Sequence, residues 1–352
     1  MIDMRSDTLT KPSEEMREVM KTAIVGDDCY GEDKSVNDLE EYCKDLFEVE
    51  GALFIPSGTM ANQVAIKAHV DEGNEIITEA NYHINFYESA STAILSRAVL
   101  NCVRKKDGII TKHDVEELIN SKPRGALYSK PQLVSIENTI NYYQGKTFPI
   151  ETIRSLYHYT REIGISLHLD GARLFNAHIA TGIPLKEYAR NVDSLSVCFA
   201  KGLGAPYGSM LMGNQEFIKD ARAIRKQFGG GLHQIGIYAA AAQHALDYHL
   251  LDIHRDHQLT KELAILLNQI PEICIDIENI ETNMIFLDLN NLTLDTSNFI
   301  KKCKDYGLLV FDWLPGIVRI VINREITAAD IYIAAEIIKK SVRNLTKEPA
   351  YA

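Results

Sequence analysis

Two apolar runs of this chain each end in one reactive side chain followed by glycine. The first is Leu167-His168-Leu169-Asp170-Gly171, and the second ends in Phe199-Ala200-Lys201-Gly202. A buried strand that ends in this way brings a polar side chain to the edge of a sheet. Lys201 follows Asp170 by 31 residues, which is room for one helical crossover between neighbouring parallel strands. The pattern predicts an α/β fold in which a carboxylate and an amine share one sheet edge.

The rest of the chain repeats this alternation. Short apolar runs typical of buried strands cover residues 52–55, 75–78, 133–136 and 195–199, with helical patterns between them, as at 60–69. Strands that alternate with helices indicate a mostly parallel sheet covered on both faces. After Gly229-Gly230-Gly231 comes a long helical pattern over 235–251. The sequence predicts a large domain over residues 1–249.

Beyond this helix the pattern changes. Strands are expected at 284–287, 308–310 and 318–321, and helices at 298–306 and 328–342. This order is typical of a smaller α+β domain, which we place at residues 250–352.

Composition narrows the function classes. The net charge of −11 over 352 residues gives no basic footprint, so nucleic acid is not an expected partner. The six cysteines are scattered without a C-x-x-C pair, which favours reduced thiols in a cytoplasmic protein and predicts no metal site. The N-terminus is too polar for a signal peptide, and no apolar run is long enough to span a bilayer, so no membrane association is expected.

An acid and an amine at one sheet edge are what a pyridoxal 5'-phosphate enzyme requires. Asp170 would keep the pyridine nitrogen of the cofactor protonated, and Lys201 would form the covalent link to its aldehyde. Ser57-Gly58-Thr59 lies between a predicted strand and a predicted helix, where free backbone N–H groups favour a phosphate. His83 follows another strand among aromatic residues and is suited to stack on a flat ring. A histidine packed in an aromatic cluster is the alternative.

Two arginines are candidates for binding a substrate carboxylate. Arg173 lies three residues after Asp170, and Arg319 lies within an apolar strand, where an unpaired charge is costly to bury. A guanidinium group matches a carboxylate with two parallel hydrogen bonds. A structural ion pair between domains is an equally good explanation of Arg319. Glu137 ends a further strand at what we expect to be the same sheet edge.

The chain resembles the threonine aldolase and aromatic amino acid β-eliminating lyase family, which are fold-type-I pyridoxal phosphate enzymes. The matching segments extend in order over nearly the whole chain: Arg5–Thr8, Gly26–Asp28, Tyr30–Asp33, Pro56–Asn62, Glu137–Thr139, His168–Ala177, Lys201–Pro206, Gly229–Gly231 and the strand with Arg319. The resemblance implies the fold-type-I architecture, with a mostly parallel seven-stranded sheet in the large domain.

The resemblance also implies roles for single residues. Lys201 would be the Schiff-base lysine and Asp170 the partner of the pyridine nitrogen, with His83 stacked on the ring. Ser57, Gly58 and Thr59 would hold the phosphate. The substrate α-carboxylate would be bound by Ser6, Arg173 and Arg319, with Arg173 close to the cofactor as well. The family is typically homotetrameric, a dimer of dimers whose active sites borrow residues from a neighbour.

Several positions depart from the family pattern. Ile140 stands where the family usually has a histidine near the β-hydroxyl group of the substrate, and Asn323 also replaces a usual histidine. His233 replaces an arginine associated with the phosphate of a neighbouring subunit, and Ala200 replaces a serine. The positions assigned to cofactor and carboxylate are kept, while those around the β-substituent change.

The resemblance implies retro-aldol cleavage of a β-hydroxy-α-amino acid to glycine and an aldehyde. With Ile140 in place of histidine, the proton acceptor would be a water, the cofactor phosphate or His83. β-Elimination, racemisation and transamination stay open, because the same cofactor supports them. A catalytically silent binding protein with this fold is a third possibility, which the intact Asp170 and Lys201 disfavour.

Overall fold

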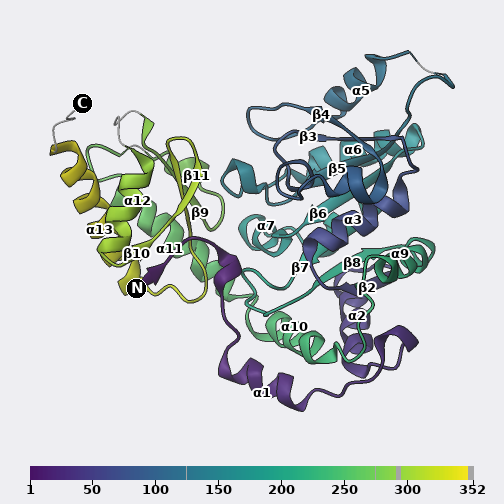
Figure 1. Cartoon of the computed structure of the whole chain (residues 1–352), viewed down its shortest axis with the longest axis horizontal. Coiled ribbons are helices and arrows are strands. Elements are labelled where there is room, and N and C mark those ends of the chain that lie inside the picture. The colour runs from purple at the N-terminus through teal and green to yellow at the C-terminus, as the bar shows by residue number, and fades with distance from the viewer. Residues whose placement is uncertain (124, 274, 291–294, 348–352) are drawn as a thin grey trace.

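The computed structural model of the protein describes residues 1–123, 125–273, 275–290 and 295–347. The larger part is built on a seven-stranded sheet in the order β2-β8-β7-β6-β5-β3-β4 (Figure 1). Its strands are β2 (Gly51–Ile55), β3 (Glu75–Glu79), β4 (Val99–Val103), β5 (Pro131–Glu137), β6 (Ser166–Gly171), β7 (Ser194–Cys198) and β8 (Ser209–Gly213). All pairings are parallel except those of β8, which runs antiparallel to both β2 and β7. The predicted fold class is therefore confirmed.

The sequence patterns missed two of these strands. β4 is a half-exposed edge strand and so lacks the continuous apolar run of a buried one. β8 follows the loop that carries Lys201 and is buried throughout. The prediction that β6 and β7 are adjacent strands is confirmed, because Asp170 of β6 pairs in register with Ser196 of β7.

Helices cover both faces of the sheet. α3 (Gly58–His69) and α9 (Gln215–Gln227) lie together on one face and pack on the apolar side chains Leu53, Ile55 and Leu211. The remaining helices before residue 250 are α1 (Glu14–Thr22), α2 (Lys34–Phe47), α4 (His83–Phe86), α5 (Lys112–Asn120), α6 (Ile150–Glu162), α7 (Leu174–Thr181), α8 (Leu185–Ala189) and α10 (Gly236–Tyr248), with 3-10 turns at Asp7–Leu9, Asp28–Tyr30 and Asn141–Tyr143 and a π-helical turn at Thr92–Ser96.

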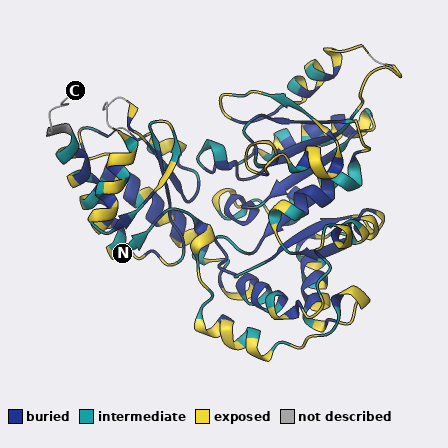
Figure 2. Ribbon diagram, viewed as in Figure 1, coloured by how far each residue is buried: buried dark blue, intermediate teal, exposed yellow. Residues whose placement is uncertain are grey.

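Alternation along the central strands separates two kinds of side chain. Leu167 and Leu169 of β6 belong to the main apolar cluster. The central strands of the large sheet are mostly dark blue, and therefore buried, in Figure 2. His168 and Asp170 therefore point to the opposite face, where α3 lies. Ser194 of β7 is on this face too and is completely buried. The sheet thus carries a strip of buried polar groups beneath α3.

A second apolar cluster lies in the C-terminal part, on the left of Figure 1. Its members come from α11 (Asp252–Leu267), β9 (Met284–Asp288), α12 (Thr296–Asp305), β10 (Leu308–Leu309), β12 (Ile317–Val321) and α13 (Ala328–Lys347), and from residues near a 3-10 turn at Ile277–Asn279. The same part of the chain contains β11 (Phe311–Leu314). β9, β12 and β11 form an antiparallel sheet. The N-terminal strand β1 (Ile2–Asp3) pairs with β10, and Met4 is buried in this cluster. The division at residues 249 and 250 stays a prediction.

Among the described residues no helix is long and apolar enough to cross a membrane. Cys29, Cys43, Cys102, Cys198 and Cys303 are free thiols, whereas Cys274 lies outside the described residues.

Candidate functional site

Five of the residues selected from the sequence line one cavity of about 360 Å³: Ser6, His83, Arg173, Lys201 and Arg319. Asp170, Ser57, Gly58 and Thr59 are not part of its lining. The cavity lies where the carboxyl ends of the parallel strands face the C-terminal sheet, the expected place for a ligand of an α/β sheet. Its wall includes Lys201 from the loop after β7 and Arg319 from β12. The full lining is Arg5, Ser6, Thr8, Leu9, His83, Tyr87, Asn141, Arg173, Lys201, Phe311, Trp313 and Arg319.

Asp170 lies buried at the end of β6, deeper than this cavity. One carboxylate oxygen accepts a hydrogen bond from Asn62 Nδ2 at 2.7 Å, and the other accepts one from the backbone N–H of Ala172 at 3.0 Å. Oxygen and nitrogen atoms of Asp170, His83 and Glu88 lie within 4.8 Å of one another. The predicted acid and the predicted stacking residue are therefore neighbours.

His83 begins the short helix α4 and lines the cavity. Its Nδ1 lies 2.8 Å from a carboxylate oxygen of Glu88, and its ring stacks on Tyr87 with 5.4 Å between centres. Burial disfavours the imidazolium form, but the Glu88 hydrogen bond and the carboxylates of Asp170 and Glu137 outweigh burial and raise the pKa of His83. His83 thus offers the cavity both an aromatic ring and a titratable nitrogen.

Glu137 supports this arrangement from the end of β5. Its carboxylate accepts hydrogen bonds from the backbone N–H groups of His83 at 2.7 Å and Asn141 at 2.8 Å. Burial and the nearby Asp170 carboxylate raise the pKa of Glu137 to about 7. The side chain therefore holds together the two loops that line the cavity.

Arg173 is buried and already paired with Asp7. Its Nε and Nη2 atoms each lie 2.7 Å from a carboxylate oxygen of Asp7, and Nη1 lies 3.3 Å from Asn141 Oδ1. Burial would raise the pKa of Asp7, but the Arg173 guanidinium outweighs it and lowers that pKa to about 2. Two of the five N–H groups of Arg173 donate to Asp7, and a third donates to Asn141.

Arg319 is held differently. Its guanidinium donates to Asn141 Oδ1 at 3.2 Å and to the backbone oxygen of Arg5 at 3.2 Å, and lies 4.2 Å from the centre of the Trp313 ring. Burial and the nearby Arg173 charge lower the pKa of Arg319 to about 10, so it stays charged at neutral pH. In the described part of the chain it forms no ion pair, and Nε is buried without a hydrogen-bond partner. The structural ion pair considered above is therefore not observed.

The Ser57-Gly58-Thr59 segment begins α3. Ser57 caps this helix, with its Oγ accepting from the backbone N–H of Met60 at 3.2 Å. The hydroxyl-bearing residues Ser57 and Thr59 are exposed. A Cβ added to Gly58 would meet only Ser209 Oγ, at 3.8 Å, and that buried hydroxyl has no partner among the described residues. Hydroxyls at the N-terminus of a helix, with open space beside them, suit a phosphate.

Ser6, the third residue predicted to bind carboxylate, also lines the cavity. It precedes a 3-10 turn, and its Oγ accepts from the backbone N–H of Thr8 at 3.2 Å. Ile140 is completely buried and belongs to the main apolar cluster, while its neighbour Asn141 lines the cavity. His233 lies elsewhere, 2.7 Å from Asp27.

Sequence reasoning missed five residues of the site: Asp7, Asn62, Glu88, Asn141 and Trp313. Asp7 and Asn62 fall inside the family segments Arg5–Thr8 and Pro56–Asn62. Those segments predict that the two residues lie near the site, but not which side chains they contact. Glu88 and Trp313 lie in segments without a local signal, and the sequence pattern did not indicate their contacts with His83 and Arg319.

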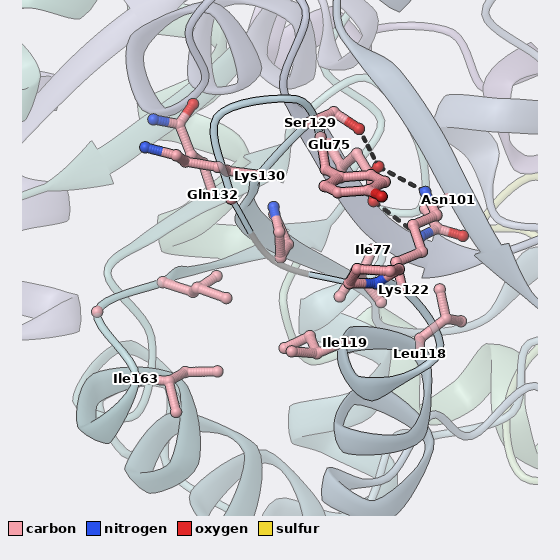
Figure 3. A pocket seen from close by; sticks show the side chains of 16 residues that line it. Glu75, Ile77, Asn101, Leu118, Ile119, Lys122, Ser129, Lys130, Gln132 and Ile163 are labelled. Carbon is pink, nitrogen blue, oxygen red and sulfur yellow. Dashed lines mark hydrogen bonds and ion pairs between the residues drawn. The ribbon is translucent and has the colours of Figure 1, made fainter.

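Another cavity, of about 390 Å³, lies at the amino ends of strands β3 and β5 (Figure 3). Glu75 at the start of β3 faces it, together with Lys122, Ser129 and Asn101 (Figure 3). The Glu75 carboxylate is satisfied by these three donors, and the cavity contains none of the residues that the sequence selected. We therefore place the functional site at the Lys201 cavity.

Comparison with known proteins identifies the class. The fold is that of a solved threonine aldolase from Leishmania major, with a TM-score of 0.85 at 20% identity, over 97% of this chain and 100% of that one. The sequence profile of the family described as "Beta-eliminating lyase" matches residues 3–290. The chain belongs to this family.

Particular relatives have more similar sequences. The chain is 36% identical to low-specificity L-threonine aldolase 1 of Arabidopsis thaliana, over 99% of this chain and 98% of the relative. It is 40% identical to the low specificity L-threonine aldolase of Escherichia coli (strain K12), over 82% of this chain and 84% of the relative. The resemblance seen in the sequence is thereby confirmed.

Proposed function

We propose that this protein is a pyridoxal 5'-phosphate-dependent aldolase that cleaves L-threonine and related β-hydroxy-α-amino acids to glycine and an aldehyde. The observation that carries this proposal is the similarity to low-specificity L-threonine aldolases over nearly the full chain. The cavity that brings Lys201 beside Arg319 and His83 supports it.

The residues present fit the cofactor. Lys201 supplies the amine for the covalent link, and Asp170 supplies the carboxylate for the pyridine nitrogen. Ser57, Gly58 and Thr59 hold the phosphate at the N-terminus of α3. When bound, the cofactor supplies an electron sink that stabilises negative charge at the substrate Cα.

Arg319 is the main anchor of the substrate carboxylate in this proposal. Arg319 lines the cavity, and its Nε is buried without a partner in the described structure. Arg173, which Asp7 holds in place, adds positive charge, and Ser6 adds a hydroxyl. Fixing the carboxylate sets which bond at Cα stands perpendicular to the cofactor ring, and that choice decides which bond breaks.

His83 takes the proton of the β-hydroxyl group. Its Nδ1 faces the Glu88 carboxylate, so in the neutral imidazole the proton resides on Nδ1 and Nε2 is left as the acceptor. Loss of the hydroxyl proton lets the Cα–Cβ bond break to give the aldehyde, and Cα is then protonated to give glycine. The role assigned elsewhere in the family to a histidine falls to His83 because Ile140 is apolar and buried.

The test is to incubate the cofactor-loaded protein with L-threonine and with L-allo-threonine and to measure glycine and acetaldehyde. Equal amounts of the two products are expected. Lys201→Ala should abolish both the products and the visible absorption of the cofactor, whereas Lys219→Ala, on the exposed side of α9, should change neither. Absence of glycine with every β-hydroxy-α-amino acid tried would refute the proposal.

A second candidate function is β-elimination, favoured by the apolar Ile140 at the position of the usual histidine. It predicts pyruvate and ammonia from L-serine or L-cysteine. The same incubations should be scored for these products and for loss of optical rotation, which would indicate racemisation.

We further propose that the protein acts in the cytoplasm as a homo-oligomer, a dimer of dimers. Large apolar side chains on its surface support self-association: Ile24, Tyr30, Ile94, Tyr248 and Leu251 are each more than 60% exposed. Sedimentation velocity of the loaded protein would test the assembly.

A further inference from the structure

Four buried or half-buried polar side chains form a continuous series of hydrogen bonds behind Asp170. Asn62 Nδ2 lies 2.7 Å from Asp170 Oδ2, and Asn62 Oδ1 lies 3.4 Å from His168 Nε2. His168 Nδ1 lies 2.9 Å from Ser194 Oγ, which lies 2.8 Å from His69 Nε2. We refer to Asn62, His168, Ser194 and His69 as the relay. It runs between the sheet and α3, from Asp170 to the far end of that helix.

The orientation of the Asn62 amide is fixed by charge. Its Nδ2 faces two carboxylates, Asp170 at 2.7 Å and Glu88 at 2.9 Å. A carboxylate only accepts hydrogen bonds, so the opposite orientation would place three oxygens together. Asn62 Oδ1 therefore faces His168, and it accepts hydrogen bonds from that ring at 3.4 Å and from Ser196 Oγ at 3.3 Å.

Both histidines of the relay are neutral near pH 7. Burial and the nearby His69 lower the pKa of His168 to about 3. Burial lowers the pKa of His69 to about 4, although Asp193 opposes this shift. A neutral imidazole has one donor and one acceptor nitrogen.

The direction of every hydrogen bond follows from this. His168 Nε2 donates to Asn62, so His168 Nδ1 must accept from the Ser194 hydroxyl. The Ser194 oxygen in turn accepts from His69 Nε2. Each donor in the relay points toward Asp170, and hydrogen bonds aligned in one direction strengthen one another.

Burying the four polar side chains of the relay in the interior of the protein costs free energy of folding. On the other face the same strand β6 buries Leu167 and Leu169 in an apolar cluster, and buried polar groups stabilise a fold less than apolar packing does. None of the four relay residues lines the Lys201 cavity. The contacts of the relay lead to Asp170 instead.

We propose that the relay positions Asp170 and stabilises its negative charge, so that the carboxylate keeps the pyridine nitrogen of the cofactor protonated. Asn62, His168, Ser194 and His69 are positioning residues, since they act through Asp170. The inference rests on the proposed function only in assuming that the cofactor is pyridoxal phosphate. The charged groups that also face Asp170 are His83, Glu88 and Glu137, and all three stay intact in the variants below.

The decisive variant is Ser194→Ala, which cuts the relay with the loss of one oxygen atom. Its control is Ser341→Ala, the same change at another completely buried serine, on α13. Both proteins are loaded with pyridoxal phosphate, and their visible absorption is titrated with pH. A ring nitrogen that holds its proton less firmly withdraws less electron density from the Lys201 linkage. We expect the titration midpoint of Ser194→Ala to rise by about 0.5 pH unit.

Kinetics give a second readout. For Ser194→Ala, kcat for L-threonine should fall about fivefold while KM stays the same, because the relay does not touch the substrate cavity. His69→Phe keeps the ring stacked on Phe217 but removes the last donor, and its effects should be in the same direction and smaller. Ser341→Ala should match the parent in both measurements.

A titration of Ser194→Ala that coincides with that of the parent would overturn the inference. Failure of the proposed function looks different. If the parent forms a visible band that depends on Lys201 but yields no glycine, the aldolase proposal fails, and the absorption titration still decides the role of the relay. If Ser194→Ala does not fold, His69→Phe at the C-terminal end of α3 is compared with the parent in the same absorption titration.

Discussion

At the scale of single residues, the site contains two charged pairs, one between distant parts of the chain and one within a single segment. Asp7 near the N-terminus pairs with Arg173 after β6, and Glu88 pairs with His83. Removing one partner of a buried pair leaves the other charge uncompensated, which costs more than the pair contributes. Single substitutions here should therefore have large effects.

Asp7→Asn should lower the free energy of unfolding by about 3 kcal/mol at pH 7, because the Arg173 charge stays buried without its carboxylate. The folded-state pKa of Asp7 is lowered to about 2 from 3.8. The stability gained from the pair is present above the ordinary value and is lost as the pH falls toward 2. Urea unfolding of parent and variant should give a gap that narrows below about pH 4. A gap independent of pH would contradict this origin.

Glu88→Gln should move the acidic limb of the kcat profile to lower pH. His83 accepts a proton only when neutral, and Glu88 is among the groups that raise its pKa. Without that carboxylate, His83 loses its proton at a lower pH, so activity persists further into acid. Rates for L-threonine between pH 5 and 8 measure the shift. An unchanged limb would mean that His83 is not the base.

At the scale of elements, α3 combines two tasks on one helix. In the proposed site its N-terminus would offer Ser57 and Thr59 to the phosphate, while its inner face supplies Asn62 and His69 to the relay. A helix fixed at both the phosphate and Asp170 would hold the two ends of one cofactor.

Ser57→Ala tests the first task against a matched cap. Ser13 caps α1 with the same Oγ-to-N–H distance, 3.2 Å, that Ser57 has on α3. Each substitution should cost about 1 kcal/mol of stability through the lost cap. Only Ser57→Ala should also weaken pyridoxal phosphate binding, by about tenfold, as measured by equilibrium dialysis. Equal cofactor affinity in both variants would remove Ser57 from the phosphate site.

At the scale of the whole molecule, the cavity is assembled from three regions of the chain. The N-terminal segment supplies Ser6, the large sheet supplies Lys201, and the C-terminal sheet supplies Arg319 with the Trp313 ring against it. Substrate binding should therefore depend on C-terminal residues more than cofactor binding does.

Arg319→Gln separates these two dependences. Loss of the guanidinium should raise KM for L-threonine by about 30-fold while cofactor affinity changes less than twofold. Arg154→Gln, on the exposed side of α6 and paired with Glu151 and Glu187, should alter neither. The measurements are initial rates over a range of substrate concentrations and dialysis of the cofactor. A loss of cofactor affinity equal to the loss of substrate affinity would place Arg319 elsewhere in the mechanism.

Local patterns predicted much of this architecture. Apolar runs that end in Asp170 and Lys201 indicated neighbouring parallel strands, and the structure confirms that β6 and β7 pair. Strand β4 escaped detection, because an edge strand needs only partial burial. The pairing of β1 with β10 also left no local signal, since two residues are too few to show a period.

The sequence by itself determined the fold class and the reactive residues, because strand endings and helix starts are local and are written in a few consecutive residues. Only the tertiary structure decided what each of those residues contacts. It holds Arg173 on Asp7 and leaves Arg319 with a buried donor, and it links Asp170 to His69 through side chains spread over α3, β6 and β7. Hydrogen bonds between residues a hundred positions apart depend on how the layers pack, and no local pattern encodes that packing.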